Sequence, residues 1–131
     1  MVQNERLVSS ERIGASSQVR RLFRRGRTLR GDTLSIVVIS GAPRRRAAFV
    51  VARGTKGSVR RNRIRRRLRE LYRRNRSLLP GDVEIVLVGN ERVLESDWHL
   101  LERETRTLFS RAQKSRMTND RSSYRPDSAV S

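Results

Sequence analysis

Twelve basic side chains and one acidic side chain, that of Glu70, lie between residues 53 and 76, and eleven of the twelve are arginines. A guanidinium carries a planar set of N–H donors that pairs with two phosphate oxygens at once and also stacks on bases. Arginines at this density are suited to binding a polyanion. The chemistry predicted for this stretch is therefore phosphate binding, with a nucleic acid as the partner.

The apolar residues of the same stretch recur at helical spacing, which places them on one side of a helix. The residues at i, i+4, i+7 and i+8 are Ile64, Leu68, Leu71 and Tyr72. We expect this helix to run from Ser58, which can act as its N-cap, to about Leu79. Its apolar side should pack against the rest of the protein.

The other sides of this predicted helix are almost entirely basic. Asn62, Arg66, Arg69 and Arg73 lie opposite the apolar side, with Arg63, Arg65, Arg67, Arg74 and Arg76 on the flanks. Like charges at i, i+4 destabilise a helix by roughly 0.2–0.5 kcal/mol per pair, and a bound polyanion would remove this cost. Asn62 could contact a base edge or a 2′-hydroxyl, or it could bond to the backbone of the first turn.

The charge of the whole chain is unevenly distributed. The 131 residues carry a net charge of +18, of which residues 1–52 contribute +8, residues 53–76 contribute +11 and residues 77–131 contribute −1. Cysteine is absent, which excludes disulfides and cysteine-based metal sites. No stretch has the length and apolarity of a membrane span or a secretory signal. We expect a soluble, cytoplasmic protein.

The remaining elements predict one α+β domain. A flexible lead-in, residues 1–11, precedes a helix from about Ser16 to Gly26 with Val19, Leu22 and Phe23 on its apolar side. Residues 33–40 and 47–52 read as strands that a short turn joins into an antiparallel pair. Residues 83–89 read as another strand, which gives the order α-β-β-α-β-α once the last helix is added.

The last predicted helix begins near Ser96 or Asp97. Its apolar side comprises Trp98, Leu101, Thr105, Leu108, Phe109 and Ala112. The domain should span residues 12–113, and residues 114–131 read as a disordered tail because they are polar and rich in serine.

Catalytic residues are not evident. Asp82 and Glu84 share one side of a strand beside a turn, where they more often cap or face solvent than hold a metal. His99 is the only histidine, and its place near a helix start is typical of a surface or packing residue. We therefore predict neither a catalytic residue nor a metal site in this chain.

The run from Val50 to Glu70 resembles the signature of the bacterial ribonuclease P protein family. Its specific part is Arg61-Asn62-Arg63, followed by Arg65-Arg66 and closed by Arg69-Glu70. Weaker similarities at Arg12-Ile13, Phe23-Arg24-Arg25-Gly26 and residues 82–88 extend the resemblance over about residues 12–112. It implies an α-β-β-β-α-β-α sandwich of the ribosomal protein S5 domain 2-like class, with a left-handed βαβ crossover.

The same resemblance implies a function. In this family a catalytic RNA subunit binds Mg²⁺ and hydrolyses the bond that joins the 5′ leader to precursor tRNA, while the protein binds both RNAs. The positions that match RNA-subunit contacts are Arg60, Arg61, Asn62, Arg63, Arg65, Arg66, Arg69 and Arg73. The positions that match leader contacts are Arg12, Phe23, Arg46, Arg53 and Lys56. Neither DNA nor a membrane is an expected partner.

Several positions depart from the family pattern. Val19 and Val37 stand where the family often has aromatics. Gly54 replaces the second lysine of a basic pair, Lys56 stands where the family prefers glycine, and Asn90 falls near where an arginine often follows the last strand. We therefore expect base stacking to contribute less to leader binding here, and charge to contribute more. Phe23 could instead pack in the core beside Leu22.

Two other classes remain open from the residues alone. A structural RNA-binding protein of the ribosomal type would lack a separate leader site. A DNA-binding protein with an arginine-rich helix should show a dimerising heptad or helix-turn-helix spacing, and neither pattern occurs in this sequence.

Overall fold

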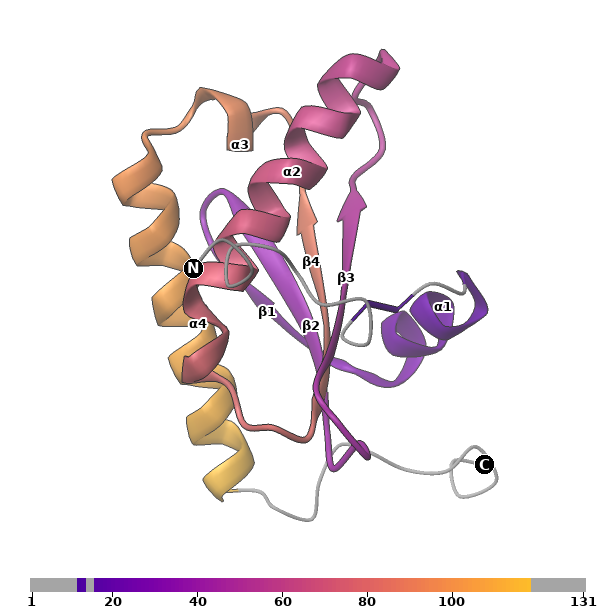
Figure 1. The fold of residues 1–131 in the computed structure, drawn as a ribbon, viewed down its shortest axis with the longest axis vertical. Coiled ribbons are helices and arrows are strands. Elements are labelled where there is room, and N and C mark those ends of the chain that lie inside the picture. The colour runs from indigo at the N-terminus through magenta and orange to yellow at the C-terminus, as the bar shows by residue number, and fades with distance from the viewer. Residues whose placement is uncertain (1–11, 14–15, 119–131) are drawn as a thin grey trace, which may run out of the picture.

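A computed structural model describes residues 12–13 and 16–118 of the chain. One four-stranded sheet carries α1 on one face and α2 and α4 on the other, so the domain has three layers (Figure 1). The elements are α1 (Ser16–Arg25), β1 (Arg27–Arg30), β2 (Leu34–Ser40), β3 (Arg46–Val51), α2 (Ser58–Asn75), β4 (Val83–Gly89), α3 (Arg92–Glu95) and α4 (Trp98–Thr118). The predicted α+β sandwich is confirmed, with α3 as a short addition.

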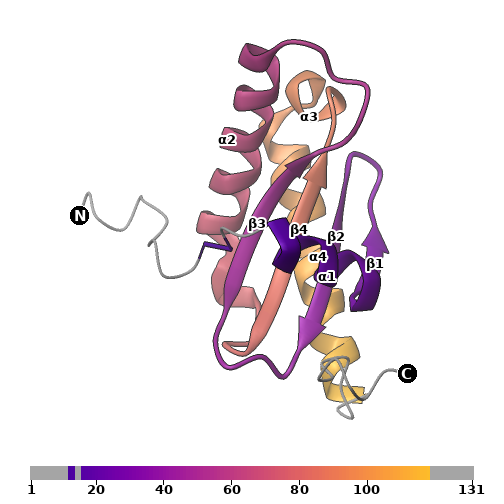
Figure 2. The ribbon, with the colours of Figure 1, turned by 90° about the vertical axis from the view of Figure 1, so that its right-hand side faces the viewer.

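The strand order is β1-β2-β4-β3. β4 pairs antiparallel with β2 and parallel with β3, so the predicted antiparallel pairing of residues 33–40 with residues 47–52 is wrong. The physical reason is the long connection through α2, which a parallel pair requires and which brings β4 in between the two strands. In Figure 2 both strands point upward, β4 lies to the right of β3 and α1 faces the viewer. Since α2 covers the opposite, far face of the sheet (Figure 1), the crossover has the left-handed sense implied by the resemblance.

The residue pattern does not predict β1, although the family order includes it. Its sequence, Arg-Thr-Leu-Arg, contains one apolar residue and so carries no strand signal of its own. It forms because each of its four residues pairs with β2, from Arg27 opposite Val38 to Arg30 opposite Ser35. Leu29 is the residue that it contributes to the core.

Two apolar clusters lie on the two faces of the sheet. The larger one joins the sheet to α2 and α4. It contains the predicted apolar side of α2 and Leu101, Leu108, Phe109 and Ala112 of the predicted apolar side of α4, with Trp98 packed against it. Phe49 packs at its edge, with its ring 5.8 Å from the ring of Tyr72. The smaller cluster lies under α1 and consists of Ile13, Leu22, Val37, Ile39, Ala48 and Val86.

The helix ends differ from the predictions. Gly57, not Ser58, is the N-cap of α2; its φ is +91°, its carbonyl accepts a hydrogen bond from the N–H of Arg61, and Ser58 is already helical. A 3-10 turn, Arg76–Leu78, follows α2. α4 continues to Thr118, five residues past the predicted domain end, because no glycine or proline stops it there. The predicted lead-in and residues 119–131 of the predicted tail lie outside the described residues.

Candidate nucleic-acid interface

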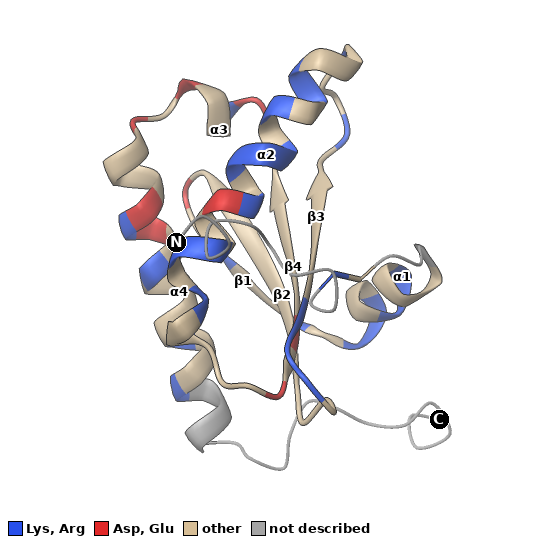
Figure 3. Ribbon diagram, in the orientation of Figure 1, with Lys and Arg blue, Asp and Glu red and all other residues tan. Residues whose placement is uncertain are grey.

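α2 presents its basic side chains away from the sheet, as the spacing predicted. Ile64, Leu68, Leu71 and Tyr72 are fully buried. On the other sides of the helix, Asn62, Arg63 and Arg66 are exposed and Arg69 is half-buried. Figure 3 shows blue segments along α2, while most of the red segments lie around α3 and the first half of α4. The basic residues are therefore concentrated along α2, while α3 and the start of α4 carry most of the acidic ones.

Some of the α2 arginines bond within the protein. Arg60 Nε lies 3.3 Å from a carboxylate oxygen of Glu91, and Arg61 Nη1 donates to the carbonyl of Thr55 at 3.3 Å. Arg73 forms an ion pair with Glu70 one turn earlier. Such arginines keep several N–H donors for another partner, because each guanidinium has five.

Arg63, Arg66 and Arg69 form a different group on α2. They follow one another at i, i+3 and i+6, and none of them has a side-chain hydrogen bond or ion pair to another described residue. Their positive charges are thus uncompensated on the described surface. An anion would find unoccupied donors here, which makes this line the most available part of the helix.

The side chain of Asn62 does not bond to the backbone of the first turn of α2 in the described residues. Its side-chain oxygen accepts a hydrogen bond from Arg65 Nη1 at 3.0 Å. The amide nitrogen of Asn62 has no partner among the described residues and lies at an exposed position. Asn62 can therefore orient the Arg65 guanidinium and still donate a hydrogen bond outward.

Three of the leader-binding residues predicted from the resemblance lie at the ends of the edge strand β3 or in the loop after it. Arg46 begins β3, and Arg53 and Lys56 follow its end as exposed side chains. Arg46 lies on the α1 side of the sheet, because side chains alternate along a strand and Ala48 belongs to the cluster under α1. Phe23 is 46% exposed on α1, so core packing is not its role.

The sheet face beside α1 has an apolar floor that sequence reasoning missed. Val50 and Val88 are half-buried, are paired across β3 and β4, and pack against the edge of the cluster under α1. The signal that could have revealed them is the alternation along both strands, which places them on the face of Ala48 and Val86. Together with exposed Phe23, they provide surfaces on which bases can lie.

Three of the departures from the family pattern have structural explanations. Val37 is 2% exposed beneath the end of α1, where a Cβ on Gly26 would lie 2.5 Å from its side chain. A residue at position 37 therefore belongs to the core. Gly54 has a φ of +104°, in the region that favours glycine. Asn90 accepts a hydrogen bond from the N–H of Arg92 at 2.8 Å and so stabilises the turn into α3.

Carboxylates of the described residues serve structural contacts. Glu84 lies 4.0 Å from Arg21, and Glu102 bonds to Arg74. Residues 12–13 and 16–118 contain no group of three or more His, Cys, Asp or Glu side chains that could hold a metal ion. His99 is exposed, and its backbone N–H donates to Asp97.

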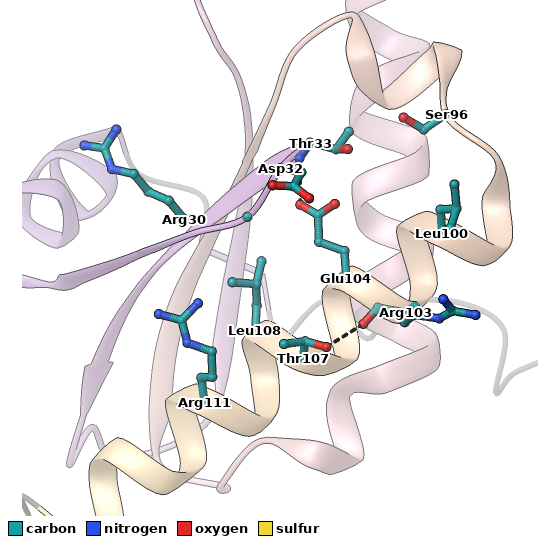
Figure 4. Close-up of a pocket in the computed structure, with 11 residues that line it drawn as sticks. Arg30, Asp32, Thr33, Ser96, Leu100, Arg103, Glu104, Thr107, Leu108 and Arg111 are labelled. Carbon is teal, nitrogen blue, oxygen red and sulfur yellow. Dashed lines mark hydrogen bonds between the residues drawn. The ribbon is translucent and has the colours of Figure 1, made fainter.

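A pocket of about 500 Å³ lies between the β1–β2 turn and α4, and none of the predicted site residues lines it. Figure 4 shows the Glu104 side chain reaching from α4 to this turn, with Arg30 and Arg111 on the same side of the pocket. One carboxylate oxygen of Glu104 accepts hydrogen bonds from the backbone N–H groups of Thr33 at 2.8 Å and Leu34 at 2.9 Å. This contact fixes the β1–β2 turn to α4.

No helix in the described part of the chain is long and apolar enough to span a membrane.

Comparison with known proteins places the chain in a family. A family model described as Ribonuclease P matches residues 7–113. The ribonuclease P protein component of Natranaerobius thermophilus is 33% identical over 88 residues, which cover 66% of this chain and 76% of that protein. The ribonuclease P protein component of a Nocardioides species is 35% identical over 85 residues, covering 62% and 73%.

The fold agrees with solved structures. The ribonuclease P protein from Thermotoga maritima superposes with a TM-score of 0.67 at 24% identity, covering 77% of this chain and 96% of that one. The identity is too low for this likeness to indicate more than a shared fold. Because the family model spans most of the chain, from before Arg12 to the region of α4, the chain belongs to the ribonuclease P protein family.

Proposed function

We propose that this protein is the RNA-binding subunit of ribonuclease P, and that it assists the magnesium-dependent endonucleolytic removal of the 5′ leader from precursor tRNA. The observation that carries the proposal is the exposed basic surface of α2, above all the unpaired line of Arg63, Arg66 and Arg69. Membership of the family identifies the enzyme in which such a surface would act.

The RNA subunit is the proposed partner of α2. The residues proposed to contact it are Arg60, Arg61, Asn62, Arg63, Arg65, Arg66, Arg69 and Arg73. Binding of phosphates to these guanidiniums releases counterions from the RNA and relieves the repulsion between like charges along the helix. The free amide nitrogen of Asn62 can donate to a base edge or a 2′-hydroxyl, so it is the residue best suited to a contact other than phosphate.

The 5′ leader of precursor tRNA is the proposed partner of the sheet face beside α1. Phe23 can stack a base, Val50 and Val88 form the floor, and Arg46 with Arg53 can hold phosphates near the two ends of β3. Lys56 lies in the loop beyond Arg53 and can add a further phosphate contact. A single-stranded leader suits this surface because its bases are free to lie on it.

The chemical step is proposed to occur on the RNA subunit. We propose that magnesium is bound mainly by the RNA subunit, since residues 12–13 and 16–118 of this protein hold no group of three or more His, Cys, Asp or Glu side chains. The protein's contribution is to bind and position the two RNAs and to reduce the repulsion between them. We propose that the protein acts in the cytoplasm, where precursor tRNA is the substrate of the assembled enzyme.

Cleavage of precursor tRNA by a bacterial ribonuclease P RNA, with and without this protein, tests the proposal. At low magnesium, where phosphate repulsion is poorly screened, adding the protein should increase the cleavage rate. A protein with Arg63, Arg66 and Arg69 replaced by alanine should stimulate much less, and Arg111→Ala, a change of an exposed arginine on α4, should stimulate as the parent does. Absence of stimulation by the parent protein would favour a structural RNA-binding role instead.

A further inference from the structure

Arg12 has its backbone fixed at the open edge of β3. It forms a parallel bridge with Ala47, and the N–H of Ile13 donates to the carbonyl of Ala47 at 2.8 Å. The carbonyl of Arg12 accepts a hydrogen bond from Arg46 Nη2 at 3.2 Å. Residues 12 and 13 thus extend the sheet by a short segment, which Figure 2 shows beside β3 and α2.

The direction of the Arg12 side chain follows from that of its neighbour. Successive side chains of an extended chain point to opposite faces of the sheet. Ile13 is buried in the cluster under α1, so Arg12 points to the face that carries α2. Arg46, by contrast, lies on the α1 face with Ala48. Arg12 and Arg46, which the family resemblance groups together, therefore point to opposite sides of the sheet.

Arg69 is the α2 residue that Arg12 approaches. Burial of the Arg69 guanidinium lowers its pKa, and the positive charges of Arg12 and Arg66 lower it further. The Nε atom of Arg69 is buried and has no hydrogen-bond partner. The guanidiniums of Arg12 and Arg66 therefore each lie close enough to that of Arg69 to repel it, where α2 meets the edge of the sheet.

This group of three has no compensating acid in the described part of the chain. Glu70, the acidic residue of α2, is paired with Arg73 on the same helix. Unpaired like charges, with one guanidinium nitrogen withdrawn from solvent, destabilise the protein alone. The arrangement is favourable when an anion lies between the three side chains and accepts their hydrogen bonds.

We infer that Arg12, Arg66 and Arg69 together form a binding site for a backbone phosphate of the RNA subunit. Arg12 then belongs to the RNA-subunit surface, contrary to the leader-binding role that the family resemblance implied for it. The inference rests on the proposed function, since it assumes that α2 binds that RNA. The proposed site includes Arg12, a residue from outside α2. A phosphate bound there would direct the RNA backbone from α2 toward the edge of β3.

The test measures two properties of each variant. The first is binding of a bacterial ribonuclease P RNA at several sodium chloride concentrations and constant magnesium. The second is the preference of the assembled enzyme for precursor tRNA over mature tRNA, which reports contacts to the leader. The variants are Arg12→Ala, Arg12→Lys and Arg46→Ala, with Arg111→Ala, a change of an exposed arginine on α4, as the control.

Arg12→Ala should make the slope of log K against log salt less steep by about one, with the preference for precursor tRNA unchanged. Arg12→Lys should restore the slope but not the full affinity, because an ammonium lacks the planar fork. Arg46→Ala should reduce the preference for precursor tRNA. Arg111→Ala should change neither property.

A loss of precursor preference in Arg12→Ala at an unchanged salt slope would overturn the inference and return Arg12 to the leader site. An Arg12→Ala protein that changes neither property would also overturn it. These results differ from a failure of the proposed function, in which Arg66→Ala and Arg69→Ala would themselves leave RNA-subunit binding and its salt slope unchanged.

Discussion

Glu102 of α4 accepts a hydrogen bond from the Nε of Arg74 of α2 at 2.9 Å, and this contact fixes the end of α2 to the rest of the protein. Asn75 Nδ2 donates to the same carboxylate oxygen at 3.4 Å and to the carbonyl of Leu71 at 2.9 Å. Arg106 Nε donates to the side-chain oxygen of Asn75 at 3.2 Å. The direction in which α2 presents its arginines therefore depends on a small polar cluster centred on a carboxylate that is 9% exposed.

This polar cluster should make the free energy of unfolding of the protein depend on pH in the acidic range. The hydrogen bond from Arg74 lowers the pKa of Glu102, although burial acts in the opposite direction. A carboxyl group whose pKa is lower in the folded state stabilises the protein above its unfolded pKa, and the contribution is lost as the pH falls through the folded pKa. Glu102→Gln should lower the free energy of unfolding at pH 7 by about 1–3 kcal/mol.

Urea unfolding of both proteins at pH 7 and at successively lower pH tests this prediction. The difference in stability between the parent and Glu102→Gln should shrink below pH 4.5, the ordinary pKa of the group. Glu95→Gln, a change at an exposed carboxylate of α3, is the control and should have little effect. An equal difference between parent and variant at every pH would contradict the prediction.

A second prediction concerns the turn between β1 and β2. A Cβ on Gly31 would lie 2.2 Å from the Glu104 carboxylate oxygen and 2.9 Å from the carbonyl oxygen of Leu34. Gly31→Ala should therefore displace Glu104 from the N–H groups of Thr33 and Leu34, and it should destabilise the protein by about 1–3 kcal/mol.

Gly81→Ala is the matched control for Gly31→Ala, because a Cβ there meets no atom within 4 Å and the backbone is not in the left-handed region. Urea unfolding gives the free energies, and hydrogen exchange at the amides of Thr33 and Leu34 locates the change. Equal stability of the two alanine variants would show that the Glu104 contact does not hold the turn.

The sequence predicted the helices better than the sheet, for a physical reason. The apolar side of α2, led by Ile64 and Leu68, follows from local spacing, as does the apolar side of α4. The sheet order depends on pairing between distant residues. Two strands joined by a short turn usually pair, but β4 comes between β2 and β3, and a single apolar residue could not signal β1.

In the candidate site, too, the features set by local spacing could be predicted and those set by contacts between distant residues could not. The exposure of Asn62 and Arg66 follows from the helix period. Leu22 and Phe23 both belong to the predicted apolar side of α1, and only the structure shows that Leu22 is buried in the core while Phe23 is exposed. The orientation of Arg12 could not be predicted, since it depends on a bridge to Ala47 some 35 positions along the chain. The spacing of residues within one helix or strand predicts which of its side chains are exposed. It does not predict which residues of two distant segments come into contact.

A third prediction concerns the leader. Phe23→Ala should weaken binding of precursor tRNA to the assembled enzyme by about 1–3 kcal/mol, the loss of one stacked base, and should leave binding of mature tRNA unchanged. Stability should change little, because the side chain is half exposed. The measurement is the ratio of the two affinities at fixed salt and magnesium.

Leu100→Ala is the control for Phe23→Ala, since Leu100 is 56% exposed on α4 and lies outside both proposed RNA surfaces. The ratio of affinities should be that of the parent in this variant. If Phe23→Ala also retained the parental ratio, the leader would not stack on α1.

The salt dependence of binding to a bacterial ribonuclease P RNA tests most directly whether the exposed side of α2 is the RNA-subunit surface. The double variant Arg66→Ala with Arg69→Ala should bind more weakly, with a slope of log K against log salt less steep by about two, and Arg111→Ala should match the parent. The variant should retain the parental circular dichroism spectrum, because neither side chain belongs to an apolar cluster. A parental slope in the folded double variant would contradict the account, since it would mean that this side of α2 does not meet phosphate.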